Sequence, residues 1–124
     1  MSDKPVLEPG PDHPITIERN DHRVVVSVAG RVVADTTSAM TLREAAYPPV
    51  QYIPLADVDT SLLEASDHTS YCPYKGDASY YSVQTPDGQT ETDLIWTYEQ
   101  PYDAVAEIAG HVAFYANRAE VSIS

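Results

Sequence analysis

The chain has 124 residues, enough for one domain with a single core, and it is acidic: 19 Asp and Glu against 7 Lys and Arg give a formal charge of −12. Such a charge repels phosphate backbones and anionic membrane surfaces, so we expect no nucleic-acid partner and no membrane partner. One cysteine excludes an internal disulfide, no apolar run approaches the roughly 20 residues of a membrane span, and no basic-then-apolar signal opens the sequence, so we expect a cytoplasmic protein.

The first half of the chain predicts an arm followed by short strands. Residues 1–14 hold four prolines and few apolar side chains, which favours an irregular N-terminal arm ahead of one β domain over 15–124. Alternating β-branched residues predict strands at 15–17, 24–28 and 31–35, the last two joined by a tight hairpin at Ala29-Gly30.

The middle of the chain is less clear. Residues 36–46 fit both a helix with a capping box and an alternating strand, and we favour the strand because Pro48-Pro49 leaves a helix too little room. An extended segment follows at 51–54. Residues 66–81 then gather the single cysteine and four of the nine tyrosines.

We expect that stretch to form a tight, kinked loop around Cys72-Pro73, closed by a positive φ at Gly76. A strand over 77–85 follows, with Ala78, Tyr80 and Ser82 on one face.

The last third continues the pattern. A strand over about 92–98 is expected to place Leu94 and Trp96 on one face, and 101–110 changes to the period of one short helix. Two more strands, at 111–115 and 120–123, complete about eight strands with one helix. We therefore predict a mainly β, small single-domain fold, either a barrel or two packed sheets.

Several segments carry a resemblance to a known family from Ile15 onward. They read V-A-G-R-V-V-A-D-T (28–36), Y-P-P-V-Q-Y-I-P (47–54), D-H-T-S-Y-C-P-Y-K-G-D-A-S-Y-Y (67–81), W-T-Y (96–98) and I-A-G-H-V-A-F-Y (108–115). In these the chain resembles the bacterial and fungal domain-of-unknown-function family 427. The resemblance implies a compact, tent-like β fold similar to Mss4, and a catalogue label of nucleotidyltransferase.

The residues give that label little support. Asp57 and Asp59 have the spacing of metal-binding carboxylates, but no Gly-rich loop is present to cradle phosphates. Zinc sites of Mss4-like folds use paired cysteines, whereas this chain has one, so we predict no metal site and no cofactor. An acidic surface turn is the simpler interpretation of the two aspartates.

Two kinds of chemistry remain for the stretch around Cys72. Cys72 and His68 have the residue types of a nucleophile and its base, and are the catalytic candidates, although a lone cysteine is more often a small buried apolar residue. Whether the chain is an enzyme stays open.

A binding pocket asks less of the sequence, because it needs an aromatic lining and a few polar groups. We predict a pocket for a small-molecule ligand around the 68–75 segment, with Lys75 as an anion or carbonyl anchor. Its candidate residues are Glu44, Tyr52, His68, Tyr74, Lys75, Tyr80 and Trp96. The alternative is a protein-interaction module with a tyrosine-rich face, and the sequence leaves the ligand and the oligomeric state open.

Overall fold

The computed structural model describes residues 5–124. Its described part is mainly β, as predicted, and consists of ten strands and three short 3-10 helices. The strands are β1 (Ile15–Asn20), β2 (Val24–Val28), β3 (Arg31–Thr36), β4 (Ala39–Glu44), β5 (Val50–Pro54), β6 (Leu63–Cys72), β7 (Gly76–Gln84), β8 (Thr90–Thr97), β9 (His111–Phe114) and β10 (Glu120–Ile123). The 3-10 helices are η1 (Leu55–Asp57), η2 (Thr60–Leu62) and η3 (Asp103–Ile108). None of the helices in the described range is long and apolar enough to cross a membrane.

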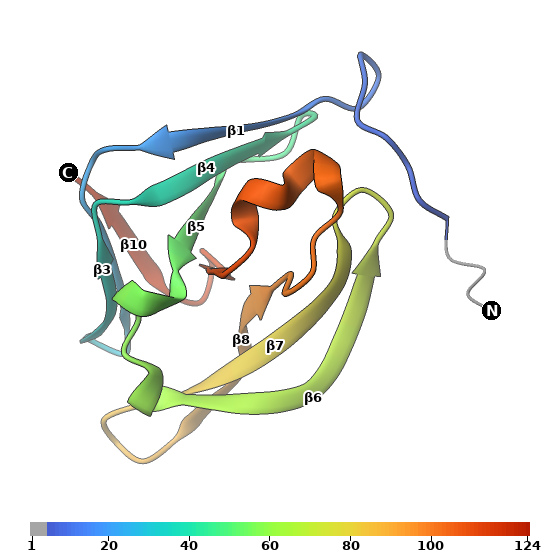
Figure 1. Cartoon of the computed structure of the whole chain (residues 1–124). Coiled ribbons are helices and arrows are strands. Elements are labelled where there is room, and N and C mark those ends of the chain that lie inside the picture. Colours follow the sequence, from blue (N-terminus) through green and yellow to red (C-terminus); the bar gives the residue numbers. More distant parts are fainter. Residues whose placement is uncertain (1–4) are drawn as a thin grey trace.

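The strands form two antiparallel sheets. Seven of them follow the order β1-β4-β5-β9-β8-β7-β6, and the other three the order β10-β2-β3. In Figure 1 the larger sheet curls around η3, with β1 and β4 on one side of it and β6 and β7 on the other. Because β1 and β6 are the two edges of this sheet, it does not close, and the predicted barrel is wrong. The arrangement is two packed sheets, and the Mss4-like expectation finds no support in it.

Two cores result, one on each face of the larger sheet. Valines of β2 and β3 pack against Ile53, Val83, Ile95 and Val112, which fills the space between the two sheets. On the other face, Val105 and Ile108 of η3 pack among Leu42, Tyr52 and Tyr80 inside the curl. Strand alternation produces this division, since neighbouring residues of a strand point to opposite faces.

The segment predicted as a loop is mostly a strand. Ser66 to Cys72 belong to the ten-residue strand β6, and only 73–75 form the turn into β7, closed by the pair Cys72↔Gly76. The sequence pattern did not reveal β6 because it is an edge strand: between Glu64 and Ser70 the side chains are exposed or half-buried, so no apolar alternation marks it. The strand over 77–84 has the faces that were predicted.

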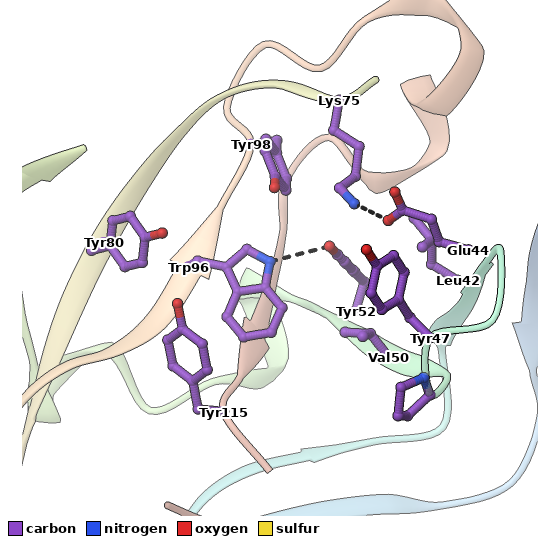
Figure 2. Close-up of a pocket in the computed structure, with 11 residues that line it drawn as sticks. Leu42, Glu44, Tyr47, Val50, Tyr52, Lys75, Tyr80, Trp96, Tyr98 and Tyr115 are labelled. Carbon is purple, nitrogen blue, oxygen red and sulfur yellow. Dashed lines mark hydrogen bonds and ion pairs between the residues drawn. The ribbon is translucent and has the colours of Figure 1, made fainter. Parts of the chain in front are cut away.

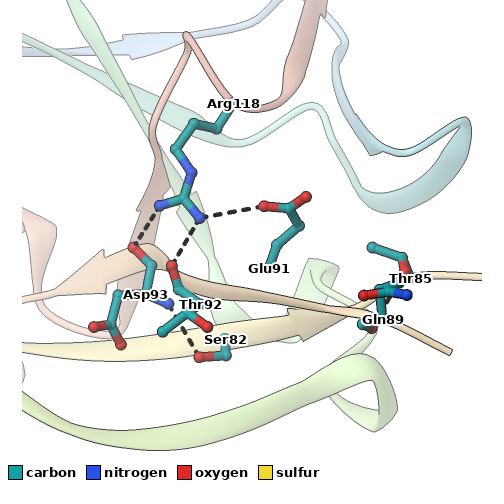
Figure 3. Close-up of polar contacts among 7 residues, drawn as sticks. All are labelled: Ser82, Thr85, Gln89, Glu91, Thr92, Asp93 and Arg118. Carbon is teal, nitrogen blue, oxygen red and sulfur yellow. Dashed lines mark hydrogen bonds and ion pairs between the residues drawn. The ribbon is translucent and has the colours of Figure 1, made fainter.

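The predicted faces of β8 are wrong at Leu94. Its register against β7 shifts between Tyr81 and Val83, and Asp93 takes a positive φ of 52°, so β8 carries a bulge. Leu94 therefore packs with Ile95 between the sheets, whereas Trp96 points into the curl. Arg118 fastens the bulge, because its guanidinium donates to the backbone oxygens of Thr92 (2.7 Å) and Asp93 (3.3 Å), as Figure 3 shows.

Other predicted elements need smaller changes. The hairpin at Ala29-Gly30 forms, with φ of 52° and 82° at its two turn residues. The predicted helix at 101–110 is the 3-10 segment η3, interrupted by a non-helical Val105. Of the predicted arm, residues 1–4 lie outside the described range, and 5–14 run beside the β6–β7 turn, where the Leu7 amide donates to the Pro73 carbonyl (2.9 Å).

Candidate functional site

The inner face of the curled sheet holds a hollow of about 160 Å³, which we call the chamber. Its walls come from β4, the β4–β5 connection, β5, the β6–β7 turn, β7, β8 and the residues that follow β8 and β9. They are Leu42, Glu44, Tyr47, Pro48, Val50, Tyr52, Lys75, Tyr80, Trp96, Tyr98 and Tyr115. Figure 2 shows the hydroxyls of Tyr47, Tyr52 and Tyr98 and the amine of Lys75 directed towards its middle.

The aromatic walls of the chamber are held by cross-strand pairing. Tyr80 of β7 lies directly opposite Trp96 of β8, so the two rings share one face. The indole N–H of Trp96 donates to the hydroxyl of Tyr52 (3.1 Å), and the two rings meet edge to face at 6.3 Å. Tyr80 exchanges a hydrogen bond with Ser70 of β6 (2.8 Å). The tyrosines on this wall are therefore fixed in position before any ligand arrives.

The β6–β7 turn places Lys75 in the chamber. Gly76 has a φ of 110°, which residues other than glycine rarely adopt, and this lets the chain reverse within three residues. The backbone of Lys75 is held on both sides, because its amide donates to Cys72 (3.2 Å) and its carbonyl accepts from Tyr102 (3.1 Å). Only 11% of the Lys75 side chain is exposed, and its amine lies 5.8 Å from the centre of the Tyr98 ring.

Glu44 is the charged partner at this end of the chamber. Its carboxylate accepts a hydrogen bond from the amine of Lys75 through one oxygen, and its other oxygen lies 2.7 Å from Nε2 of His13. Burial alone would raise the pKa of the Glu44 carboxyl, but the hydrogen bonds and charges of Lys75 and His13 outweigh it and hold that pKa below its usual value. Glu44 is therefore an anion at neutral pH, and Lys75 compensates its charge.

Three phenols of the chamber, those of Tyr52, Tyr98 and Tyr115, remain hydrogen-bond donors over the whole physiological range. Burial raises the pKa of Tyr52 and of Tyr98, because the phenolate would lie in a poorly solvated space. Burial and the hydrogen bond that the Tyr115 hydroxyl shares with Tyr80 likewise raise the pKa of Tyr115 to about 12. The chamber thus combines neutral O–H donors with one compensated ion pair.

The sequence model of the family described as a domain of unknown function, DUF427, matches residues 16–124. The chain belongs to the DUF427 family. This confirms the resemblance drawn from the sequence segments. The comparison with curated proteins gave no match.

The DUF427 domain brings together most of the candidate ligand-binding residues. Glu44, Tyr52, Lys75, Tyr80 and Trp96 all line the chamber.

His68 and Tyr74 lie outside the chamber. His68 is an exposed residue of β6 whose ring packs behind that of Tyr80, with 4.4 Å between their centres. Tyr74 stacks on His13 at 4.0 Å and borders another hollow beside the N-terminal segment. The sequence analysis treated 68–75 as one loop, whereas five residues of strand and turn lie between His68 and Tyr74.

The two catalytic candidates are not assembled into a pair. Cys72 and His68 are four positions apart on the extended strand β6, which separates them by about 13 Å at the usual rise per residue. Cys72 packs against the core inside the curl, whereas His68 is an exposed residue whose ring contacts Tyr80. The thiol therefore has a packing role, and its supposed base lies too far away to activate it.

Sequence reasoning missed His13 and Tyr115. His13 comes from the N-terminal segment, which carries no pattern that would predict contact with Glu44, 31 residues away. Tyr115 could have been found, because it follows Ala113 by two residues and strand alternation places both on the inner face.

Asp57 and Asp59, the two aspartates weighed for a nucleotidyltransferase site, form hydrogen bonds with nearby residues. Asp57 accepts a hydrogen bond from the hydroxyl of Thr36 (2.6 Å), and Asp59 accepts from the amide and hydroxyl of Ser61 (3.2 and 2.6 Å). Neither lines the chamber. Within residues 5–124, no group of three or more His, Cys, Asp or Glu side chains is placed to hold a metal ion.

Proposed function

We propose that this DUF427 domain is a small-molecule binding protein whose chamber recognises a neutral carbonyl group. The observation that carries the proposal is the hydrogen-bond arrangement of Tyr52. Its oxygen accepts the indole N–H of Trp96, and among the described residues this is its only hydrogen bond. The proton of the Tyr52 hydroxyl is therefore available to an acceptor in the chamber.

Two further donors support the same ligand chemistry. The hydroxyl of Tyr98 has no hydrogen-bond partner among the described residues, and the amine of Lys75 keeps protons beyond the one it gives to Glu44. Three donors around one hollow suit an oxygen with two lone pairs. A cavity of about 150 Å³ holds a benzene molecule, so a chamber of about 160 Å³ has room for a carbonyl and a few attached atoms.

The charges favour a neutral acceptor over an ion. An anion would approach the carboxylate of Glu44 in a protein with a formal charge of −12, and a cation would approach the amine of Lys75. Aromatic cages for ammonium ions present ring faces, whereas here the hydroxyls of Tyr47, Tyr52 and Tyr98 point inward. A carbonyl accepts the same hydrogen bonds without the cost of burying a charge.

A flat, tyrosine-rich interaction face is less consistent with the burial of these residues. Of the nine tyrosines, all within the described range, only Tyr47 is an exposed residue, with 66% of its surface accessible. The others are buried or half-buried.

The test uses the single tryptophan, which forms part of the chamber wall, as an intrinsic fluorescence reporter. The purified chain is titrated with butanamide, butanoate and butyltrimethylammonium, and we expect the amide to bind most tightly. Tyr52→Phe keeps the ring and removes the donor, so it should weaken amide binding about five- to tenfold, as expected for one hydrogen bond. Tyr81→Phe is the matched control, because Tyr81 lies on the opposite face of β7 and packs between the sheets.

Two results would overturn the proposal. One is the absence of a fluorescence or calorimetric response to any of the three probes. The other is a preference for the trimethylammonium probe that Tyr52→Phe leaves unchanged, which would indicate recognition by aromatic ring faces instead.

A further inference from the structure

A second hollow adjoins the chamber and differs from it in chemistry. It has a volume of about 490 Å³ and opens between the two sheets, and we call it the groove. Val26, Val121 and Ile123 line it from the three-stranded sheet, and Ile53 and Phe114 from the larger one. Val121 and Val26 are direct cross-strand partners, so their side chains form one apolar wall.

The chamber and the groove share part of their walls. Tyr47, Pro48, Val50, Trp96 and Tyr115 line both hollows.

The pairing of β5 and β9 explains how two hollows on opposite faces of one sheet can adjoin. The ladder between these strands consists of Ile53↔Val112 and Pro54↔His111. Continued in register, it would next pair Tyr52 with Ala113, but within the described residues no such pair forms. Ladder pairing between the two strands therefore ends beside Tyr52, which contacts Trp96, a residue that lines both hollows.

We propose that the natural ligand is amphipathic, a carbonyl compound with an unbranched apolar chain that extends from the chamber, past the residues shared by both walls, into the groove. The proposal rests on the proposed function, because the chamber must first hold the carbonyl. The groove surface is apolar, and Val121 and Ile123 keep 36% and 50% of their surface exposed to solvent at its mouth. A chain in the groove would cover that surface, which favours binding through the hydrophobic effect. A volume of about 490 Å³ lies within the usual range for ligand sites.

The test is a chain-length series on the full chain. Butanamide, hexanamide and octanamide are titrated by calorimetry, with the fluorescence of Trp96 as a second signal. Each buried methylene should raise affinity about three- to fourfold, so octanamide should bind on the order of 100-fold more tightly than butanamide.

Two matched variants locate the chain. Val121→Asp places a charge in the groove on an exposed strand, and should reduce the gain from butanamide to octanamide to less than about tenfold while leaving butanamide binding unchanged. Val32→Asp is the control, since Val32 is also an exposed strand valine (52% accessible) but lines neither hollow. It should leave the whole series unchanged.

The outcomes separate this inference from the proposed function. Butanamide binding that weakens in Tyr52→Phe but shows no dependence on chain length would overturn the amphipathic ligand and keep carbonyl recognition. A chain-length gain that Val121→Asp does not reduce, or that Val32→Asp reduces equally, would also overturn the groove assignment. Failure of all three amides to bind would overturn both.

Discussion

Replacing Lys75 by methionine should destabilise the fold, because it leaves the carboxylate of Glu44 without its main partner in a poorly solvated place. The exposed fractions of the two side chains are 11% and 13%. Removing one member of a buried ion pair costs about 3–5 kcal/mol, and since His13 still contacts Glu44 we expect about 2–3 kcal/mol here.

The assay is urea unfolding followed by tryptophan fluorescence at several pH values. The pKa of Glu44 is lowered from its ordinary value of 4.5 in the folded wild-type protein. The ion pair therefore stabilises the fold at pH values above 4.5, and this contribution is lost as the pH falls through the lowered pKa. In Lys75→Met, burial should instead raise the pKa of Glu44. The difference in the free energy of unfolding between the wild-type protein and Lys75→Met should therefore be largest near neutral pH and become smaller in acid.

A double-mutant cycle isolates the pair. Glu44→Gln combined with Lys75→Met should be more stable than the sum of the single changes predicts, because no buried charge remains unpaired. Arg23→Met tests an exposed ion pair, that of Arg23 with Asp35, and should change stability little. A loss in Lys75→Met that is below about 1 kcal/mol and independent of pH would refute the reasoning.

Three other predictions concern Trp96, the buried tyrosines and Cys72. Trp96→Ala should cost about 2–3 kcal/mol in urea unfolding followed by circular dichroism, because the variant lacks the single tryptophan; this is less than the roughly 3–4 kcal/mol expected for the fully buried Ile95→Ala, since Trp96 is half-buried beside a hollow. In an alkaline titration followed by ultraviolet absorbance, Tyr52 and Tyr98 should ionise only as the protein unfolds: their raised pKa values favour the folded state below pH about 10, and that advantage is lost as the pH rises further. Ionisation of all nine tyrosines in the folded protein would contradict this. Cys72 should react slowly with a thiol reagent in the native protein and fast in urea, and equal rates would show that it is not packed in the core.

Much of the fold was predictable because strand alternation is local. The β-branched or aromatic runs expected as strands at 24–28, 31–35 and 77–85 form β2, β3 and β7, each within one residue of the expected bounds. Two elements escaped this reasoning for physical reasons. β6 is an edge strand with little burial, so its sequence carries no apolar pattern. The bulge at Asp93 changes the face on which Leu94 lies, and no proline or glycine in the sequence indicates that bulge.

The candidate site was predictable only in its residue types. An unusual number of tyrosines, one tryptophan and few cations pointed to a polar aromatic pocket, and five of the proposed residues line the chamber. His68 was chosen for its position beside Lys75 in the chain, but a strand and a turn separate the two, and His68 packs behind Tyr80 instead.

The sequence by itself determined the family, the mainly β class and the chemistry available for a site, because composition, motifs and alternation are properties of short segments. Tertiary structure alone decided which of those side chains meet. The ion pair joins Lys75 to Glu44 across 31 residues, the hydrogen bond from Trp96 to Tyr52 spans 44, and the β5–β9 ladder joins Ile53 to Val112. Contacts between distant segments depend on how the sheet curls, and no local pattern encodes that curvature.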